Sequence, residues 1–221
     1  MPEVKILCGC PIYDWKCDVA KDYFDNLKQL SYPLDFVFVD NSESADFSEW
    51  IIKTYGFNVL RSPCVGTTRL RQCIALNVLR DYFLSGDWTH LFLLESDLIP
   101  RKNIVELLLE HNKDCVAAPY LLNKDKGLAC VTERKFIANQ GGWTHVFVKP
   151  GFLDGEFKRA PNGVGLGCVL IKRKVIEAVL FRAAAFHADT QFWEDVQKEG
   201  FEVFIDTGLM VRHYPNGYPD F

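Results

Sequence analysis

The sequence predicts an α/β protein with a doubly wound, mostly parallel central sheet that is flanked by helices. Two observations lead to this prediction. Apolar runs alternate with amphipathic segments from residue 4 to about residue 122, and such alternation indicates parallel strands joined by right-handed crossovers. The first strand, "VKILCGC", is apolar nearly throughout, as a strand covered on both faces should be. The pattern then becomes mixed without a clear boundary, so we expect a single domain over residues 1–221.

Each element of the first part has a local signal. The helix expected after the first strand carries Val19, Tyr23 and Leu27 on one stripe, and Gly56 is a good stop for the second helix. The third helix has the strongest pattern, and its expected apolar face comprises Leu70, Ile74, Val78, Leu79 and Tyr82. The expected strands cover residues 4–10, 34–40, 57–62, 89–97 and 114–122, and the expected helices cover residues 17–30, 47–56, 67–84 and 102–112.

The second part is expected to be a small mixed unit that completes the same domain. Residues 123–162 are irregular, glycine-bearing and aromatic, with short strand-like pieces. A strand followed by a helix is expected over residues 167–181, a helix over residues 189–200 and a strand over residues 201–206.

Composition and charge are those of an ordinary globular protein. Hydrophobic residues make up 48% of the chain and charged residues 24%, which allows a sizeable core. The formal net charge of −4 argues against a broad surface for nucleic acid. No run of about 18 apolar residues predicts a membrane span, and no secretory signal opens the sequence, so we expect a cytoplasmic location.

The eight cysteines are expected to be reduced thiols. A chain of this size does not need disulfides for stability, and no signal for export precedes it. Several of the cysteines lie inside apolar runs, where cysteine packs as a small hydrophobic side chain. The spacing of Cys8, Cys10 and Cys17 could suggest zinc, but no second pair of ligands follows at a finger-like distance. We therefore do not expect a zinc site.

Two carboxylates stand at the end of an apolar strand. The stretch "THLFLLESD" ends on Glu95 and Asp97, with only Ser96 between them. Like charges this close repel, and a divalent cation removes that penalty; Mg²⁺ and Mn²⁺ prefer oxygen ligands and are often shared with phosphates. Ligands of doubly wound sheets bind beyond the carboxyl ends of the strands, where Asp40 also lies. The pattern favours a metal–diphosphate site, and a solvated acidic turn is the alternative.

Five stretches stand out in order along almost the whole chain. They are "VFVDNSES", "TTRLRQCIALNVLRD", "LFLLESDLIPRKNIVELLL", "GLGCVLIKRKVIEAV" and "ADTQFWEDVQKEGFEVFIDTGLMVRHY". Together they resemble the GT-A nucleotide-sugar glycosyltransferases, and most closely the family 2-like inverting members. The resemblance implies a GT-A fold in which residues 1–122 bind the nucleotide sugar and residues 123–221 bind the acceptor and carry out catalysis. It further implies Mn²⁺ or Mg²⁺ as cofactor, a UDP- or GDP-linked sugar as donor, and a glycan or other hydroxyl compound as acceptor.

On the donor side, "ESD" stands where that family has its DxD motif. The resemblance implies that Asp97 binds the metal directly, and that Glu95, in place of the commoner aspartate, binds ribose or metal. It implies that Asp40 hydrogen-bonds the base and that His213 completes the metal shell. Arg71 occupies the place of an arginine near the diphosphate, where Gln72 replaces the usual asparagine. The other implied donor-side residues are Pro11, Ile12 and Tyr13 around the base, Arg69 beside Arg71, and Ser96.

The resemblance implies Asp189 as the catalytic base. The family has an acidic pair before a helix, followed about three turns later by glycine and an aromatic residue. Ala188–Asp189 and Gly200–Phe201 have that spacing, although the first acid of the pair is lost. The literal dipeptide Glu194–Asp195 is the alternative, but it is expected inside the helix. The residues expected on the acceptor side are Trp143, His145, Gly165 and His187.

Other interpretations stay open beside this one. A sugar-nucleotide pyrophosphorylase is a second enzyme hypothesis, although "CVGTTR" at 64–69 does not follow the first strand as its glycine-rich loop should. A non-catalytic carbohydrate-binding protein of the same fold is a third hypothesis. "GVGLG" at 163–167 does not open a helix after a first strand, so close packing or an acceptor-side loop explains it better than a dinucleotide site. Asp40 could simply form a turn, and His213 could be an ordinary half-buried histidine.

Overall fold

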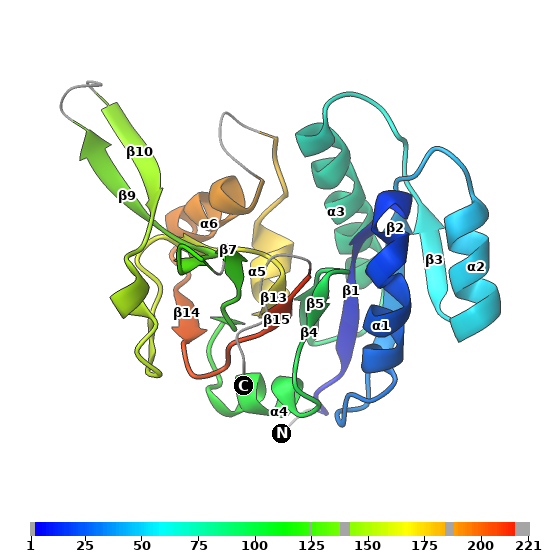
Figure 1. Ribbon diagram of the computed structural model, residues 1–221, viewed down its shortest axis with the longest axis horizontal. Helices are drawn as coiled ribbons and strands as arrows, with labels where there is room; N and C mark the ends of the chain where they lie inside the picture. Colours follow the sequence, from blue (N-terminus) through cyan, green and yellow to red (C-terminus); the bar gives the residue numbers. More distant parts are fainter. Residues whose placement is uncertain (1–2, 124, 138–141, 184–187, 215–221) are drawn as a thin grey trace.

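The computed structural model describes residues 3–123, 125–137, 142–183 and 188–214. In these parts of the chain, eight strands form a mostly parallel central sheet with helices against it (Figure 1). The strand order is β11-β14-β6-β13-β4-β1-β2-β3. This architecture confirms the predicted α/β class and the mostly parallel central sheet.

The first half of the chain builds the regular side of the sheet. Strand β1 lies between β2 and β4 and is parallel to both, and β3 lies parallel outside β2. Gly56 adopts a left-handed φ of 72° and ends its helix, as expected. The strands are β1 (Ile6–Ile12), β2 (Asp35–Asp40), β3 (Asn58–Arg61) and β4 (His90–Leu94), and the helices are α1 (Cys17–Leu27), α2 (Asp46–Tyr55), α3 (Thr68–Ser85) and α4 (Ile104–Glu110).

Helix α3 buries Leu79 as expected, but the rest of its buried face differs from the expected one. Leu70 is 40% exposed, and Ile74, Val78 and Tyr82 are only half-buried. The reason is a second packing surface: Asn77 exchanges hydrogen bonds with the backbone of Phe181, at 2.7 and 3.1 Å. This contact turns the helix so that a neighbouring stripe faces the sheet. The buried residues of α3 are Cys73, Ala75, Leu76, Leu79 and Phe83.

One strand of the second half runs against its neighbours. Strand β13 (Cys168–Lys172) inserts antiparallel between β4 and β6 (Cys115–Ala117). Because Cys168 pairs with Leu94, the start of β13 lies beside the carboxyl end of β4. The loop that precedes β13 is thereby placed at the edge of the sheet where Glu95 and Asp97 follow.

The remaining elements complete the second half. Strand β15 (Arg212–His213) pairs antiparallel with β5 (Leu98–Ile99), which sets His213 opposite Leu98. The strand-like pieces predicted within residues 123–162 form the β9–β10 hairpin, which projects from the body of the molecule (Figure 1). The other elements are η1 (Asp14–Lys16), β7 (Leu121–Asn123), β8 (Leu128–Ala129), β9 (Val131–Ile137), β10 (Gly142–Phe147), η3 (Pro150–Phe152), β11 (Phe157–Arg159), β12 (Gly163–Val164), α5 (Arg173–Ala178), α6 (Ala188–Lys198) and β14 (Val203–Asp206).

The seven cysteines whose side chains the structure describes are unpaired, and all but Cys64 are buried. Burial raises the pKa of Cys10 to about 12, so its thiol stays protonated. Among the described residues, none of the helices has the length and the apolar character that crossing a bilayer requires.

Candidate functional site

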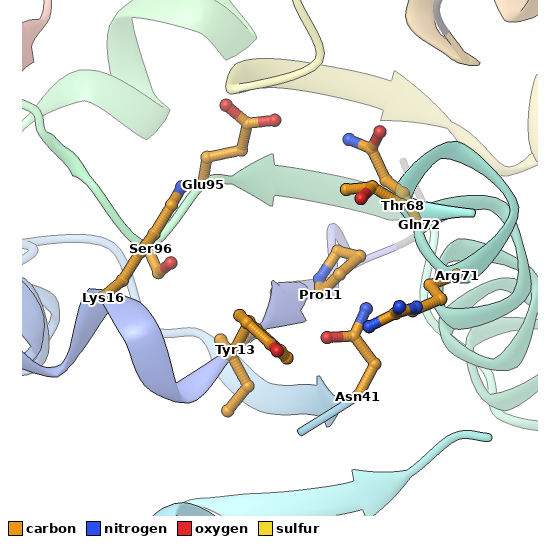
Figure 2. Close-up of a pocket in the computed structure, with 10 residues that line it drawn as sticks. Pro11, Tyr13, Lys16, Asn41, Thr68, Arg71, Gln72, Glu95 and Ser96 are labelled. Carbon is orange, nitrogen blue, oxygen red and sulfur yellow. The ribbon is translucent and has the colours of Figure 1, made fainter. Parts of the chain in front are cut away.

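A cavity of about 490 Å³ opens at the carboxyl ends of β1, β2 and β4 (Figure 2). This is the edge at which doubly wound sheets bind ligands. The end of β1 and the loop after it form one wall, the start of α3 forms another, and the end of β4 closes the cavity. The lining residues are Pro11, Ile12, Tyr13, Lys16, Asn41, Thr68, Arg71, Gln72, Glu95 and Ser96.

Six of the expected donor-side residues therefore share one cavity: Pro11, Ile12, Tyr13, Arg71, Glu95 and Ser96. Thr67 holds the start of α3 in place, because its side-chain oxygen accepts a hydrogen bond from the backbone of Leu70. The guanidinium group of Arg71 is fixed in turn by the carbonyl oxygen of Gly66, 3.1 Å from Nε. Arg69 lies on the same turn, is exposed, and is not among the residues that line the cavity.

Asp40 contacts its own turn rather than the cavity. Its side chain is fully buried, and its oxygens accept hydrogen bonds from Ser42, Ser48 and Arg61. Asp40 is not among the residues that line the cavity, and the expected contact between Asp40 and a nucleotide base stays a prediction. Asn41 is the residue of this turn that lines the cavity. The turn-forming role that the sequence also allowed accounts for the contacts of Asp40.

Asp97 has one engaged and one unengaged oxygen. Its Oδ2 lies 2.7 Å from Nζ of Lys16 and 3.5 Å from Nε2 of His213. Its Oδ1 is buried and has no hydrogen-bond partner among the described residues. Burial alone would raise the pKa of Asp97, but the His213 contact and the Lys16 charge outweigh burial and lower it. Asp97 is therefore held as a carboxylate, and its Oδ1 is available to a ligand.

His213 is oriented by the backbone. Its Nδ1 lies 2.8 Å from the carbonyl oxygen of Leu121, so Nδ1 carries the donated proton and Nε2 faces Asp97. Burial lowers the pKa of His213, but the contacts with Asp97 and Leu121 raise it more strongly, and the net shift is upward. Metal-binding histidines usually donate one ring N–H to such a carbonyl oxygen, which leaves the other ring nitrogen for the metal.

Glu95 joins the two halves of the site. Burial, the charge of Asp97 and the charge of Asp189 raise the pKa of Glu95 to about 7, against the opposing charge of Lys16. Its backbone N–H donates to the carbonyl oxygen of Gly167 at 2.8 Å, across to the loop before β13. Its Oε2 lies 3.5 Å from the hydroxyl group of Tyr120. Tyr120 also lines a second cavity.

The second cavity, of about 200 Å³, is mainly apolar and contains Asp189. Asp189 stands in the first turn of α6, where its Oδ1 accepts a hydrogen bond from the backbone of Thr190 at 2.7 Å. A Cβ at Gly165 would lie 2.2 Å from the Tyr120 hydroxyl, so close packing requires glycine here. The lining residues are Tyr120, Leu122, Cys130, Thr132, Phe147, Val164, Gly165, Asp189 and Thr190.

The alternative acids of α6 are engaged elsewhere. Asp195 forms a bidentate ion pair with Arg182, with both N–O distances at 2.8 Å. Glu194 lies 3.0 Å from Nε2 of His145, whose side chain is buried. None of these residues is among those that line the second cavity. The structure therefore brings Gly165 together with Asp189 and leaves His145 behind α6. The Trp143 side chain and His187 lie outside the described residues.

The side-chain atoms around Asp97 fit a divalent cation as ligands. A buried carboxylate oxygen without a partner, a second carboxylate and an oriented imidazole nitrogen are ligands that Mn²⁺ accepts, and Mg²⁺ accepts the oxygens. No group of three or more such side chains stands ready as a metal cage among the described residues. The ammonium group of Lys16 contacts one of these oxygens, Oδ2 of Asp97.

Three contributors were missed from the sequence: Lys16, Asn41 and Tyr120. The first two follow the ends of β1 and β2, and loops after parallel strands face the site in this class of sheet, so their position alone was a usable signal. Tyr120 had no such signal, because its role depends on how the glycine loop at 163–167 packs against it.

No protein-family model and no curated protein matches the sequence. The solved structures that resemble the fold include two of particular interest. A197 from STIV is 16% identical with a TM-score of 0.50, over 96% of this chain and 86% of that one. The crystal structure of GalNAc-T7 with UDP, GalNAc and Mn²⁺ is 13% identical with a TM-score of 0.68. This match covers 99% of the present chain but only 46% of GalNAc-T7. The fold is GT-A-like; the likeness does not single out family 2.

Proposed function

We propose that this protein is a metal-dependent glycosyltransferase that moves a sugar from a nucleoside diphosphate to an acceptor hydroxyl group, with inversion. In this proposal residues 1–122 hold the nucleotide sugar and residues 123–221 supply the acceptor site and the base. The GT-A-like fold and the structural neighbour crystallised with UDP, GalNAc and Mn²⁺ support the proposal. Mn²⁺ or Mg²⁺ is the expected cofactor, and a UDP- or GDP-linked sugar is the expected donor.

The observation that carries the proposal is that the linings of the two cavities contact each other through Glu95 and Tyr120. Glu95 lines the large cavity, and Tyr120, 3.5 Å from its carboxylate, lines the small one. The negative charge of Asp189 in the small cavity acts on Glu95 in the large one. A transferase needs such a pair of sites, because the donor and the acceptor must meet at one reacting carbon.

The residues of the large cavity suit a nucleoside diphosphate. Pro11, Ile12 and Tyr13 offer an apolar wall for the base, and Arg71 offers a cation for the phosphates. Asp97 and His213 would hold the metal, with Glu95 beside them. A bound divalent cation would offset the charge that develops on the departing diphosphate. The protein's part is to fix these charges before the reaction begins.

Asp189 is the proposed base. It stands in the small cavity among apolar side chains, where an acceptor hydroxyl group could lie within its reach. Removing the hydroxyl proton there leaves the acceptor oxygen to attack the sugar carbon from the side away from the diphosphate, which inverts that carbon. Asp195 and Glu194 are less suited, because Arg182 and His145 already engage them.

Nucleotide and metal binding test the proposal directly. Thermal unfolding is followed with UDP and with GDP, each with and without Mn²⁺. We expect at least one nucleotide to raise the melting temperature, and to do so more strongly with Mn²⁺. Asp97→Asn should abolish the Mn²⁺-dependent part. If neither nucleotide stabilises the protein under any condition, the proposal is wrong.

A second measurement separates catalysis from mere binding. Hydrolysis or transfer of a UDP- or GDP-linked sugar is followed in wild type and in Asp189→Asn. We expect the variant to bind the nucleotide normally and to lose activity by roughly 10²- to 10⁴-fold, the usual contribution of a general base. Equal activity in both proteins would remove Asp189 from the mechanism. Binding without any turnover in wild type would favour a carbohydrate-binding protein.

A further inference from the structure

Lys16 is the cation that stands on the carboxylate pair in this structure. Its Nζ lies 2.7 Å from Oδ2 of Asp97, and its side chain is mostly buried, at 28% exposure. The residue ends η1, in the loop that follows β1, and it lines the large cavity. Figure 2 shows its side chain running along the cavity toward Glu95 and Ser96.

The position of Lys16 conflicts with a metal at the same oxygen. A divalent ion bound through Asp97 would lie within a few ångströms of the ammonium group, and like charges at that distance repel strongly in a partly buried site. Arg71, which lines the same cavity, is fixed by Gly66 and forms no ion pair with a carboxylate in the part of the chain that the structure describes. Lys16 is thus the cation that must yield when a metal arrives.

The side chain of Lys16 can move to another anionic partner. A lysine is a compact charge on a flexible stem and can exchange one anionic partner for another by rotating that stem. The large cavity beside it is the space proposed for the diphosphate. Phosphate oxygens there would offer the ammonium group a new partner at the moment when Asp97 is given over to the metal.

We infer that Lys16 is a built-in counter-ion that competes with the divalent cation for Asp97 and moves to the diphosphate when the nucleotide binds. The inference rests on the proposed function, since it needs a nucleoside diphosphate and a metal in this cavity. It makes Lys16 a positioning residue that couples the two ligands: metal binds weakly alone and tightly with nucleotide. It also predicts that nucleotide and metal bind cooperatively.

The test is the affinity for Mn²⁺ alone, measured by calorimetry on wild type and on Lys16→Met. We expect Lys16→Met to bind Mn²⁺ about tenfold more tightly in the absence of nucleotide, within the usual range of coupling between two ligands. UDP or GDP should tighten Mn²⁺ binding in wild type by a similar factor, and should do so much less in the variant. The variant should also bind the nucleotide alone more weakly than wild type.

A matched control removes the same charge from the adjoining helix. Lys21 in α1 forms a 2.6 Å ion pair with Asp25 on an exposed surface, and Lys21→Met should change neither affinity. Thermal unfolding of both variants shows that they are folded. Should Lys16→Met bind Mn²⁺ with unchanged or weaker affinity while wild type binds Mn²⁺ and nucleotide through Asp97, the inference fails and the proposed function stands. If wild type binds neither ligand, both fail.

Discussion

The guanidinium group of Arg61, at the end of β3, lies 2.6 Å from the fully buried carboxylate of Asp40, at the end of β2. The same guanidinium group donates to the backbone carbonyl oxygens of Ser42 and Glu43, at 2.7 and 3.2 Å. One arginine thus neutralises the buried acid and also holds the turn that carries Asn41 to the large cavity. This part of the cavity therefore depends on an ion pair whose two residues do not line it.

Arg61→Met should destabilise the protein by roughly 3 kcal/mol, at the lower end of what breaking a buried ion pair costs, because it leaves Asp40 buried without its cation. Urea unfolding measures the loss. The control is Arg159→Met, which breaks a 3.2 Å pair with Glu202 between two well-exposed side chains. That change should cost less than about 1 kcal/mol. Equal losses of stability in the two variants would show that Arg61 does not stabilise the buried carboxylate of Asp40.

Asn41→Ala should weaken nucleotide binding by about five- to tenfold, the effect of one lost hydrogen bond, at little cost in stability. Asp40→Asn should lower the stability and leave nucleotide binding nearly unchanged, because its carboxylate contacts Ser42, Ser48 and Arg61. Calorimetry with UDP and GDP, together with urea unfolding, separates the two effects. A stable Asp40→Asn variant that no longer binds nucleotide would restore Asp40 as the base-binding residue.

Gly165→Ala should destabilise the protein by about 1–3 kcal/mol, the range of forced overpacking, because the new Cβ would meet the buried Tyr120. The displaced Tyr120 should also disturb the contact with Glu95. Gly151→Ala is the matched control, since a Cβ at Gly151 meets nothing within 4 Å. Thermal unfolding of both variants decides the question. An unchanged melting temperature for Gly165→Ala would contradict the close packing.

His90 gives the stability a defined dependence on pH. Burial and the positive charge of Lys172 lower the pKa of His90 to about 4, from an ordinary value of 6.5. The unfolded chain therefore binds more protons than the folded chain between these values, and stability falls as pH falls from about 6.5 to about 4. Above that window the contribution of His90 is fully present.

Replacing His90 by Gln removes this titration. Urea unfolding from pH 7.5 to pH 4 should show a decline in wild type that is shallower in His90→Gln, because only the wild-type side chain takes up a proton on unfolding. Parallel curves would mean that His90 keeps its ordinary pKa in the folded protein.

The first half of the fold could be predicted because each element carries a local signal. The buried strands are short apolar runs, and Gly56 ends its helix by the left-handed conformation that glycine favours. The face of α3 could not be predicted, because the bond between Asn77 and Phe181 joins residues far apart in the sequence. The direction of β13 could not be predicted for the same reason, because an apolar run does not show whether the strand is parallel or antiparallel to its neighbours.

The site divides in a similar way. Glu95, Arg71 and Tyr13 could be predicted because they follow strands or begin a helix at the binding edge. The burial of Asp40 and its ion pair could not be predicted, since its partner Arg61 is a single arginine on a later strand. Lys16 was missed because a lone lysine belongs to no motif; its place in the loop after β1 was a usable signal for the cavity, but its contact with Asp97 follows only from the fold.

The reversal of β13 has a consequence for how the chain folds. Strand β4 is fully apolar from Leu91 to Leu94, yet one of its two sides stays unpaired until Cys168–Lys172 arrive. Pairing across so long a separation is slow, and an open apolar edge is prone to join other chains while it waits. A fragment that stops before β13 should therefore aggregate rather than fold, so we do not expect residues 1–122, the half proposed to bind the nucleotide, to be a separable module.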